Sequence, residues 1–153
     1  SLGTCKILEG IRNYTEINIP NNPHYFPPAT LYIVRECQWR GIEDEDQLSN
    51  ISVCADELLN NALIHGNDLD EDKKISIQLI FDPEKFTMSF EDEGTGFDHQ
   101  KIVTALSAGH SAPPTKRGLF IVQSLMDEFS FNESGNKVTA VKYINEEGRR
   151  ILH

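Results

Sequence analysis

The sequence has few basic residues, no paired cysteines and no long hydrophobic run. Its 153 residues include 14 Lys and Arg against 24 Asp and Glu, a formal net charge of −10. Because nucleic-acid binders neutralise phosphates with clustered Lys and Arg, this balance argues against a DNA- or RNA-binding module. Cys5, Cys37 and Cys54 show no Cys-x-x-Cys spacing, which indicates neither a disulfide framework nor a zinc site. We expect buried thiols.

The chain also lacks the features of a membrane or exported protein. No apolar run approaches the ~18 residues of a transmembrane helix, and the start does not have the basic-then-apolar pattern of a signal peptide. We therefore expect a cytoplasmic protein. The 39% apolar and 25% charged residues are ordinary for a globular chain. The length and the absence of repeats or linkers predict a single domain over residues 1–153.

The hydrophobic pattern predicts alternating groups of strands and helices. We expect an edge strand at 15–19, helices at 29–40 and 47–65, a hairpin of strands at 75–79 and 86–90, a helix at 119–126, and a last hairpin of strands at 129–131 and 138–143. Prolines from Pro20 to Pro28 exclude regular structure before about Ala29. The first helix has an apolar pattern that includes Leu31 and Trp39, and residues 43–46 read as an exposed acidic turn. This order predicts an α+β layered sandwich with a mainly antiparallel sheet.

The helix at 47–65 has a polar stripe opposite its apolar face. Glu57, Asn61 and His65 are four residues apart, and Gly66 follows them. A carboxylate and a carboxamide one turn apart can together hold a metal ion and a hydroxyl group. The alternative interpretation is a solvated helix face.

Two further segments have features of a nucleotide site. In Asp92-x-Gly94-x-Gly96, an acid at a strand end can accept a hydrogen bond from an exocyclic amine, and the glycines let a nucleotide approach bare backbone. The alternative is an ordinary glycine turn with a surface acid.

The other segment is Arg117-Gly118-Leu119. It begins a helix after the small, polar, Pro-containing stretch 105–116, which we expect to be a mobile loop. Free N–H groups at a helix N-terminus bind anions, so a phosphate fits there. A helix cap beneath a surface loop is the alternative.

Taken together, the three segments resemble the conserved boxes of the histidine kinase-like (GHKL) ATPases. The chain is most similar there to the small anti-sigma factor serine/threonine-protein kinases. The resemblance covers about residues 15–145 and rests on E-L-L-N-N-A-L-I-H-G at 57–66, E-D-E-G-T-G-F at 91–97 and R-G-L-F-I-V-Q-S-L-M-D-E-F at 117–129. It implies a two-layer α/β sandwich whose mainly antiparallel sheet is covered on one face by helices.

The resemblance also implies roles for individual residues. Glu57 would be the general base for the hydroxyl that attacks the γ-phosphate, and Asn61 would bind Mg²⁺. Asp92 would accept a hydrogen bond from the adenine amino group, Gly94 and Gly96 would leave room for the nucleotide, and Thr139 would join the adenine network. His65 and Gly66 would lie beside the nucleotide. Gly118 and Leu119 would donate backbone N–H groups to the phosphates. Lys116 stands where the family often has a glycine and would serve the phosphates, whereas Arg117 either touches a phosphate or only borders the lid at 105–117.

The function implied is an ATP- and Mg²⁺-dependent anti-sigma factor serine-protein kinase that acts by partner switching. It would sequester a sigma factor and phosphorylate a small anti-anti-sigma (STAS-type) protein, with partner contacts on the helix at 29–40 and on the lid. The family also implies a homodimer. One alternative is an ATP-binding regulatory module without kinase activity, including one excised from a longer signalling protein. Another is an interaction domain that binds no nucleotide.

Overall fold

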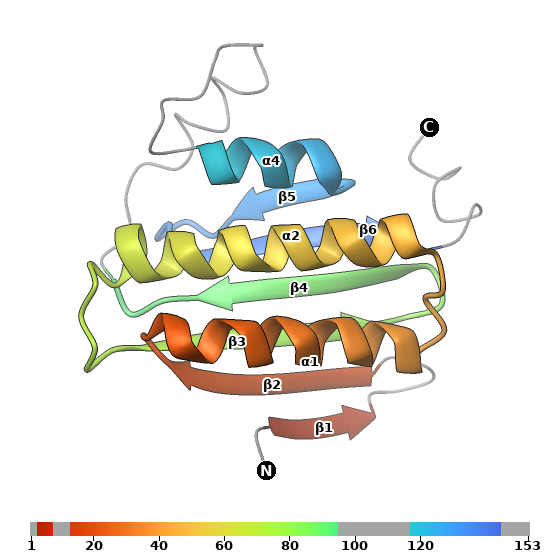
Figure 1. Ribbon diagram of the computed structural model, residues 1–153, viewed down its shortest axis with the longest axis horizontal. Helices are drawn as coiled ribbons and strands as arrows, with labels where there is room; N and C mark the ends of the chain where they lie inside the picture. The colour runs from red at the N-terminus through yellow and green to blue at the C-terminus, as the bar shows by residue number, and fades with distance from the viewer. Residues whose placement is uncertain (1–2, 8–12, 95–116, 145–153) are drawn as a thin grey trace.

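The computed structural model describes residues 3–7, 13–94 and 117–144 (Figure 1). The strands are β1 (Gly3–Ile7), β2 (Asn13–Pro20), β3 (Lys74–Phe81), β4 (Lys85–Glu91), β5 (Glu128–Phe131) and β6 (Lys137–Tyr143). The helices are α1 (Phe26–Trp39), which follows the short 3-10 turn η1 (Pro23–Tyr25), α2 (Glu45–Asn61), which continues into the π-helical turn η2 (Ala62–Gly66), and α4 (Arg117–Leu125).

The strands form one six-stranded sheet in the order β1-β2-β3-β4-β6-β5. Every neighbouring pair is antiparallel. The three helices lie on one face of this sheet, with α2 between α1 and α4 (Figure 1). The two-layer α/β sandwich with a mainly antiparallel sheet is therefore confirmed.

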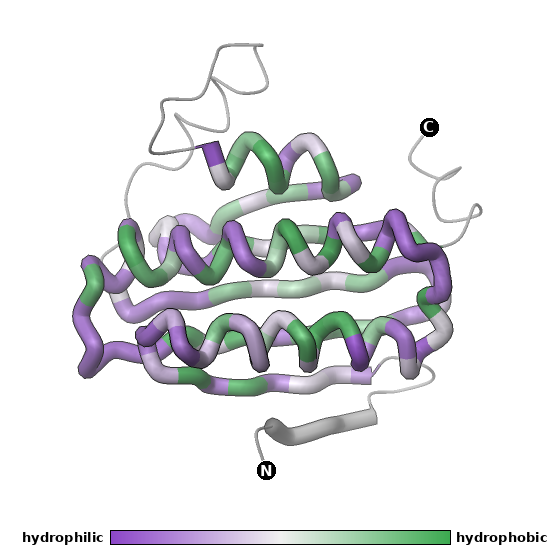
Figure 2. Tube along the Cα trace, in the orientation of Figure 1, coloured by the Kyte–Doolittle hydropathy of each residue, from purple (hydrophilic) through white to green (hydrophobic). Residues whose placement is uncertain are grey.

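The core fills the space between the sheet and the helices. Ile77, Phe90 and Val138 stand opposite one another on three adjacent strands and are 0–4% exposed. Figure 2 shows the same separation along the chain, with hydrophobic residues in α4 and β4 and hydrophilic ones in the connection from η2 to β3. Two of the expected buried thiols, Cys37 and Cys54, lie in this core, and burial raises the pKa of each to about 12.

The N-terminal part of the sheet differs from the sequence-based prediction. The strand expected at 15–19 is longer, as β2, and it is not an edge strand, because β1 pairs with one side of it and β3 with the other. The sequence did not predict β1 as a separate strand.

Helix α1 begins earlier than expected, at Phe26 instead of Ala29. Pro27 and Pro28 are tolerated because the N–H groups of the first helical turn have no partner within the helix. The buried stripe of α1 consists of Phe26, Ala29, Thr30, Ile33 and Cys37. Leu31 and Trp39, which the apolar pattern included, are instead 49% and 83% exposed.

Helix α2 also begins earlier than predicted, at Glu45, inside the acidic run. The side chain of Asp44 caps it by accepting hydrogen bonds from the N–H groups of Asp46 and Gln47, at 2.8 and 3.1 Å. Its expected end at His65 falls in the π-helical turn η2, where the N–H of Asn67 donates to the carbonyl of Ala62 at 2.7 Å. None of the helices in the ranges described above has the length and apolarity that a membrane crossing requires.

Candidate functional site

The three motif segments meet at one end of the sandwich. This end holds the last turns of α2, the turn η2, the end of β4 and the first turn of α4 (Figure 1). Two glycine contacts join the segments: Gly66 of η2 lies against Asp92, and Gly118 of α4 lies against Glu57. Residues far apart in the sequence are thereby brought to one place.

The carboxylate of Glu57 lies at the N-terminus of α4. A Cβ atom placed on Gly118 would overlap an oxygen of that carboxylate. Gly118 and Leu119 are the second and third residues of α4, so within Arg117–Leu125 no carbonyl lies four residues earlier to accept from their N–H groups. The positive end of the helix dipole favours negative charge here, both from the carboxylate and from an incoming phosphate.

The neighbouring residues Asn60 and Asn61 lie in two different environments. Asn60 is exposed, and its side-chain amide donates to the carbonyl of Asp56 in the same helix at 2.9 Å. Asn61 is half-buried and follows Glu57 by one helical turn. Asn61 therefore remains the better candidate for an oxygen ligand beside Glu57, as its spacing indicates.

Asp92 is held in place at the end of β4 and is only 8% exposed. Its Oδ1 accepts from the N–H of Gly94 at 2.8 Å. Its main chain pairs with Asn136, which accepts from the Asp92 N–H at 2.9 Å and donates through its amide to the Asp92 carbonyl at 3.3 Å. Burial raises the pKa of Asp92 above its usual value; the Gly94 N–H and Lys73 act against this, and Glu91 adds to it.

Gly66 and Gly94 permit a close approach of two backbones. A Cβ atom on Gly66 would overlap the Asp92 carboxylate, and one on Gly94 would overlap the carbonyl oxygen of Gly66. Both positions therefore require glycine before any nucleotide is considered, because η2 and the loop after β4 touch there.

Thr139 is not brought to this end of the helix layer. Its hydroxyl forms a hydrogen bond with Ser89, directly opposite on β4, at 3.0 Å. Met88 and Ala140, the next pair along, belong to the core under the helices. Since side chains alternate along a strand, Thr139 and Ser89 face the other side of the sheet. The role in the adenine network that the resemblance implies for Thr139 stays a prediction, with Thr139 on the face of the sheet away from the helices and Asp92 against Gly66 of η2.

The structure describes some of the other predicted site residues and not the rest. His65 and Gly66 lie on η2 and are half-buried, and Arg117 is the exposed first residue of α4. Gly96, Lys116 and the stretch 105–116 lie outside the residues that the structure describes.

Sequence reasoning missed two asparagines that support Asp92. Asn136 read as part of a hairpin turn, and Asn67 as part of the loop that ends the helix. Asn67 is fully buried, and its Oδ1 accepts from the N–H of Glu93 at 2.8 Å. Its position directly after the His-Gly pair was the available signal, but its burial depends on tertiary contacts.

The donor set at this end suits a hard cation shared with a ligand. Within the described part of the chain, no three His, Cys, Asp or Glu side chains gather into a group that could hold a metal ion alone. The carboxylate of Glu57 and the amide oxygen of Asn61 are oxygen donors, which Mg²⁺ prefers, and Mg²⁺ commonly takes its remaining ligands from water and substrate phosphates.

Comparison with known protein families decides the assignment. Residues 19–142 match a family model described as the histidine kinase-like ATPase domain. The chain belongs to the histidine kinase-like ATPase family. This membership confirms the resemblance read from the three motifs, and an ATPase domain of this family implies ATP binding.

Within the histidine kinase-like ATPase family, the chain is similar to curated bacterial regulators. It is 26% identical over 148 residues to the serine-protein kinase RsbW of Bacillus subtilis, covering 92% of this chain and 91% of that protein. It is 24% identical over 137 residues to RsbW of Listeria monocytogenes, covering 85% and 87%. It is 24% identical over 107 residues to the anti-sigma F factor of Clostridium perfringens, covering 65% and 75%. These relatives support the anti-sigma factor kinase branch.

Proposed function

We propose that this protein is a cytoplasmic anti-sigma factor serine-protein kinase that transfers the γ-phosphate of ATP to a serine of another protein. The observation that carries the proposal is the Glu57 carboxylate at the N-terminus of α4, one helical turn from Asn61. Phosphoryl transfer to a hydroxyl requires a base close to a group that binds phosphate, and a helix N-terminus is such a group. The relatives named serine-protein kinases support the same activity.

In this proposal Glu57 acts on the hydroxyl of the target serine. The carboxylate takes the proton as the serine oxygen forms its bond to the γ-phosphorus. The bond between that phosphorus and the bridging oxygen of the β-phosphate breaks, so ADP leaves and phosphoserine forms. The N–H groups of Gly118 and Leu119 stabilise phosphate charge, because they lie in the first turn of α4 as the structure describes it, where N–H groups point toward an anion.

Mg²⁺ is part of the proposal. Asn61 would supply an amide oxygen, and Glu57 lies near enough along α2 to orient a bound water or hydroxyl. When bound, the ion would offset the negative charge of the phosphates, which the net charge of −10 makes necessary.

Adenine would be recognised at the other side of the site. Asp92 is nearly buried and is held by Gly94 and Asn136, which leaves its second carboxylate oxygen to accept from the adenine amino group. The close packing of Gly66 against this carboxylate supports a fixed geometry. A fixed acceptor discriminates between bases because a base without the amino group leaves it unpaired.

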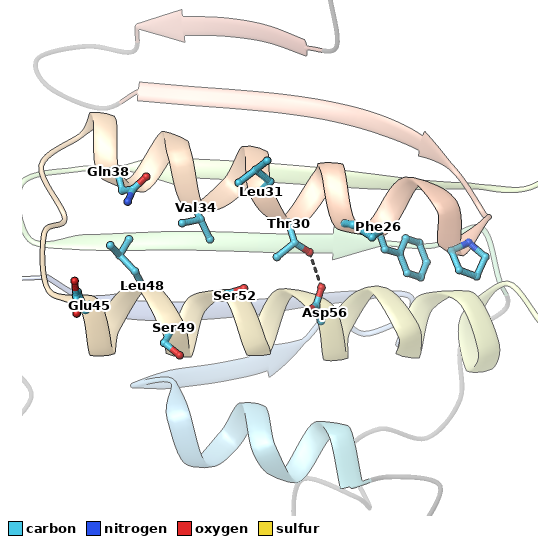
Figure 3. Close-up of a pocket in the computed structure, with 12 residues that line it drawn as sticks. Phe26, Thr30, Leu31, Val34, Gln38, Glu45, Leu48, Ser49, Ser52 and Asp56 are labelled. Carbon is cyan, nitrogen blue, oxygen red and sulfur yellow. Dashed lines mark hydrogen bonds between the residues drawn. The ribbon is translucent and has the colours of Figure 1, made fainter.

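The protein partners would be a sigma factor and an anti-anti-sigma protein. A groove of about 590 Å³ lies between α1 and α2, on the other side of α2 from α4 (Figure 3). Leu31, Val34 and Leu48 contribute apolar surface, whereas the acids Glu45 and Asp56 lie among its lining residues, which include no Lys or Arg. We propose that this groove binds a partner segment with apolar and basic side chains, because these complement its surface.

The direct experiment is phosphoryl transfer between purified proteins. The full chain is mixed with Mg·ATP and the anti-anti-sigma protein encoded nearest to its gene, and phosphoserine is located by mass spectrometry. Phosphoserine on that protein supports the proposal. ATP binding without transfer to it would instead favour a nucleotide-binding regulatory module, and absence of ATP binding would favour an interaction domain.

A further inference from the structure

Asn67 is a buried side chain near the proposed site that makes three hydrogen bonds. It is 0% exposed. Its Nδ2 donates to the Asn21 Oδ1 at 3.1 Å and to the Lys74 carbonyl at 3.0 Å, and its Oδ1 accepts from the Glu93 N–H at 2.8 Å. One side chain thus joins the end of β2, the start of β3 and the loop after β4.

These bonds fix the orientation of the carboxamide. An Asn side chain has two N–H donors and one carbonyl acceptor. Both donors of Asn67 face acceptors, the Asn21 Oδ1 and the Lys74 carbonyl, so the Oδ1 must face the Glu93 N–H. The reversed orientation would place N–H against N–H and oxygen against oxygen.

The backbone of Asn67 ties the same residue to η2. Its N–H donates to the carbonyl of Ala62 at 2.7 Å, which closes the turn that carries His65 and Gly66. Asn21 is itself held, because its amide donates to the carbonyl of Asp70 at 3.0 Å. Asn67 therefore connects the turn that holds Gly66 with the loop that begins at Asp92.

We propose that Asn67 is a positioning residue for base recognition: its Oδ1 holds the Glu93 N–H and thereby aims the Asp92 carboxylate at the nucleobase. The inference rests on the proposed ATP site. Glu93 lies between Asp92 and Gly94, whose N–H also binds the carboxylate, so a shift at position 93 moves both the carboxylate and its partner. The Glu93 N–H is part-buried in this bond and loses its acceptor in a variant without the Asn67 oxygen, so we expect the loop to move.

The test compares two nucleotides that differ at one group. ADP has a 6-amino group for Asp92 to recognise, and purine riboside 5′-diphosphate lacks it. Hydrogen bonds to a charged acceptor predict that the unsubstituted protein prefers ADP by roughly 10-fold or more. Titration calorimetry of Asn67→Ala should show this preference falling to within about 2-fold, because affinity for ADP drops and affinity for the analogue changes little.

Asn21→Ala is the matched control. It removes the acceptor for the Asn67 amide and the bond to Asp70, but it leaves the Asn67 acceptor for the Glu93 N–H in place. We expect it to lower the urea midpoint and to keep the preference for ADP. Asn67→Asp is a second variant of equal size. It keeps an acceptor oxygen for the Glu93 N–H but sets its other oxygen against the Asn21 Oδ1 and the Lys74 carbonyl, so we expect a lower urea midpoint with the preference for ADP and slow amide exchange at Glu93 retained. Loss of the preference in folded Asn67→Asp would overturn the inference.

The outcomes separate the inference from the proposed function. A folded Asn67→Ala with the full preference for ADP would overturn the inference and leave the proposed site standing. Equal loss of the preference in Asn21→Ala would also overturn it, because the role would then be structural alone. Failure of the unsubstituted protein to bind ADP would overturn the proposed function itself.

Discussion

Gly66 lies directly against the carboxylate of Asp92, so closely that a Cβ atom at position 66 would overlap it. The two residues come from different motifs, one at the end of the long helix and one at the end of a central strand. Their contact requires both the missing side chain of Gly66 and the sheet register that places Asp92 beside η2. The adenine side of the proposed site therefore depends on backbone packing as much as on the acid itself.

Gly66→Ala should disturb this contact. Overpacking at such a position costs about 1–3 kcal/mol of stability, and displacement of the Asp92 carboxylate should lower ADP affinity by roughly 10-fold or more. The matched control is Gly41→Ala. Gly41 has a φ of +96° with nothing within 4 Å of an added Cβ, so alanine there should cost about 1 kcal/mol by backbone strain alone. Unchanged ADP affinity in Gly66→Ala, measured by calorimetry, would contradict the packing role.

Asp92 predicts a pH dependence with opposite signs for binding and for stability. Burial raises its pKa above the usual 3.8. The folded protein therefore holds this proton more tightly than the unfolded chain. The stability contributed by Asp92 is present below about pH 3.8, the ordinary pKa, and is lost as pH rises through the raised pKa of the folded state. Nucleotide binding needs the ionised acceptor, so ADP affinity should fall as pH drops through that same pKa.

Asp92→Asn separates these two effects. The amide oxygen can still accept from the Gly94 N–H, and no buried charge remains, so urea unfolding at pH 7 should show stability equal to or above that of the unsubstituted protein. ADP affinity should fall by roughly 10- to 100-fold and should no longer vary with pH in the acid range. If Asp92→Asn binds ADP as tightly as the unsubstituted protein, Asp92 does not recognise the base.

The neighbours Asn60 and Asn61 offer a test of the metal ligand. The Asn60 amide is occupied by its own helix backbone and is exposed, so Asn60→Ala should retain phosphoryl transfer within about 2-fold. Asn61→Ala should lower transfer by roughly 100-fold or more, because loss of a metal ligand removes transition-state stabilisation. The measurement is initial rate against Mg²⁺ concentration. Equal losses in both variants would show that the effect comes from the helix and not from a ligand.

The groove between α1 and α2 predicts a partner-binding variant. Leu31→Glu places a charge on its apolar surface and should weaken binding of at least one partner protein by roughly 10-fold or more. Stability should change little, because Leu31 is 49% exposed. Val53→Glu is the control: Val53 is 40% exposed on α2 and does not line the groove. If titrations show that Val53→Glu weakens partner binding as much as Leu31→Glu does, the groove is not the binding site.

Much of the fold could be predicted because local patterns and tertiary packing agree. In β3 and β4 the alternation of apolar and polar residues matches the buried and half-buried faces of the sheet. The apolar stripe of α2 is also where the sequence places it. The pattern of α1 predicted the helix but not its buried face, because Leu31 and Trp39 are apolar but exposed, and hydrophobicity alone does not say which face of a helix meets the sheet.

The motif residues of the candidate site can be located from the sequence, whereas the side chains that support them cannot. Spacing along one helix links Glu57 and Asn61, so local geometry suffices there. For Thr139 the strand is predictable from the sequence, whereas the face that its side chain takes depends on the register of the sheet. Asn67 could not be found locally, because its partners come from three separate segments of the chain.

The most direct measurement is a single-turnover assay of transfer from radiolabelled Mg·ATP to the anti-anti-sigma protein. It compares Glu57→Gln with Asp46→Asn, which removes an exposed acid at the other end of α2. We predict that Glu57→Gln binds ATP and loses transfer by roughly 100-fold or more, as expected for removal of a general base, while Asp46→Asn stays within about 2-fold of the unsubstituted protein. Transfer by Glu57→Gln at the rate of the unsubstituted protein would contradict the account.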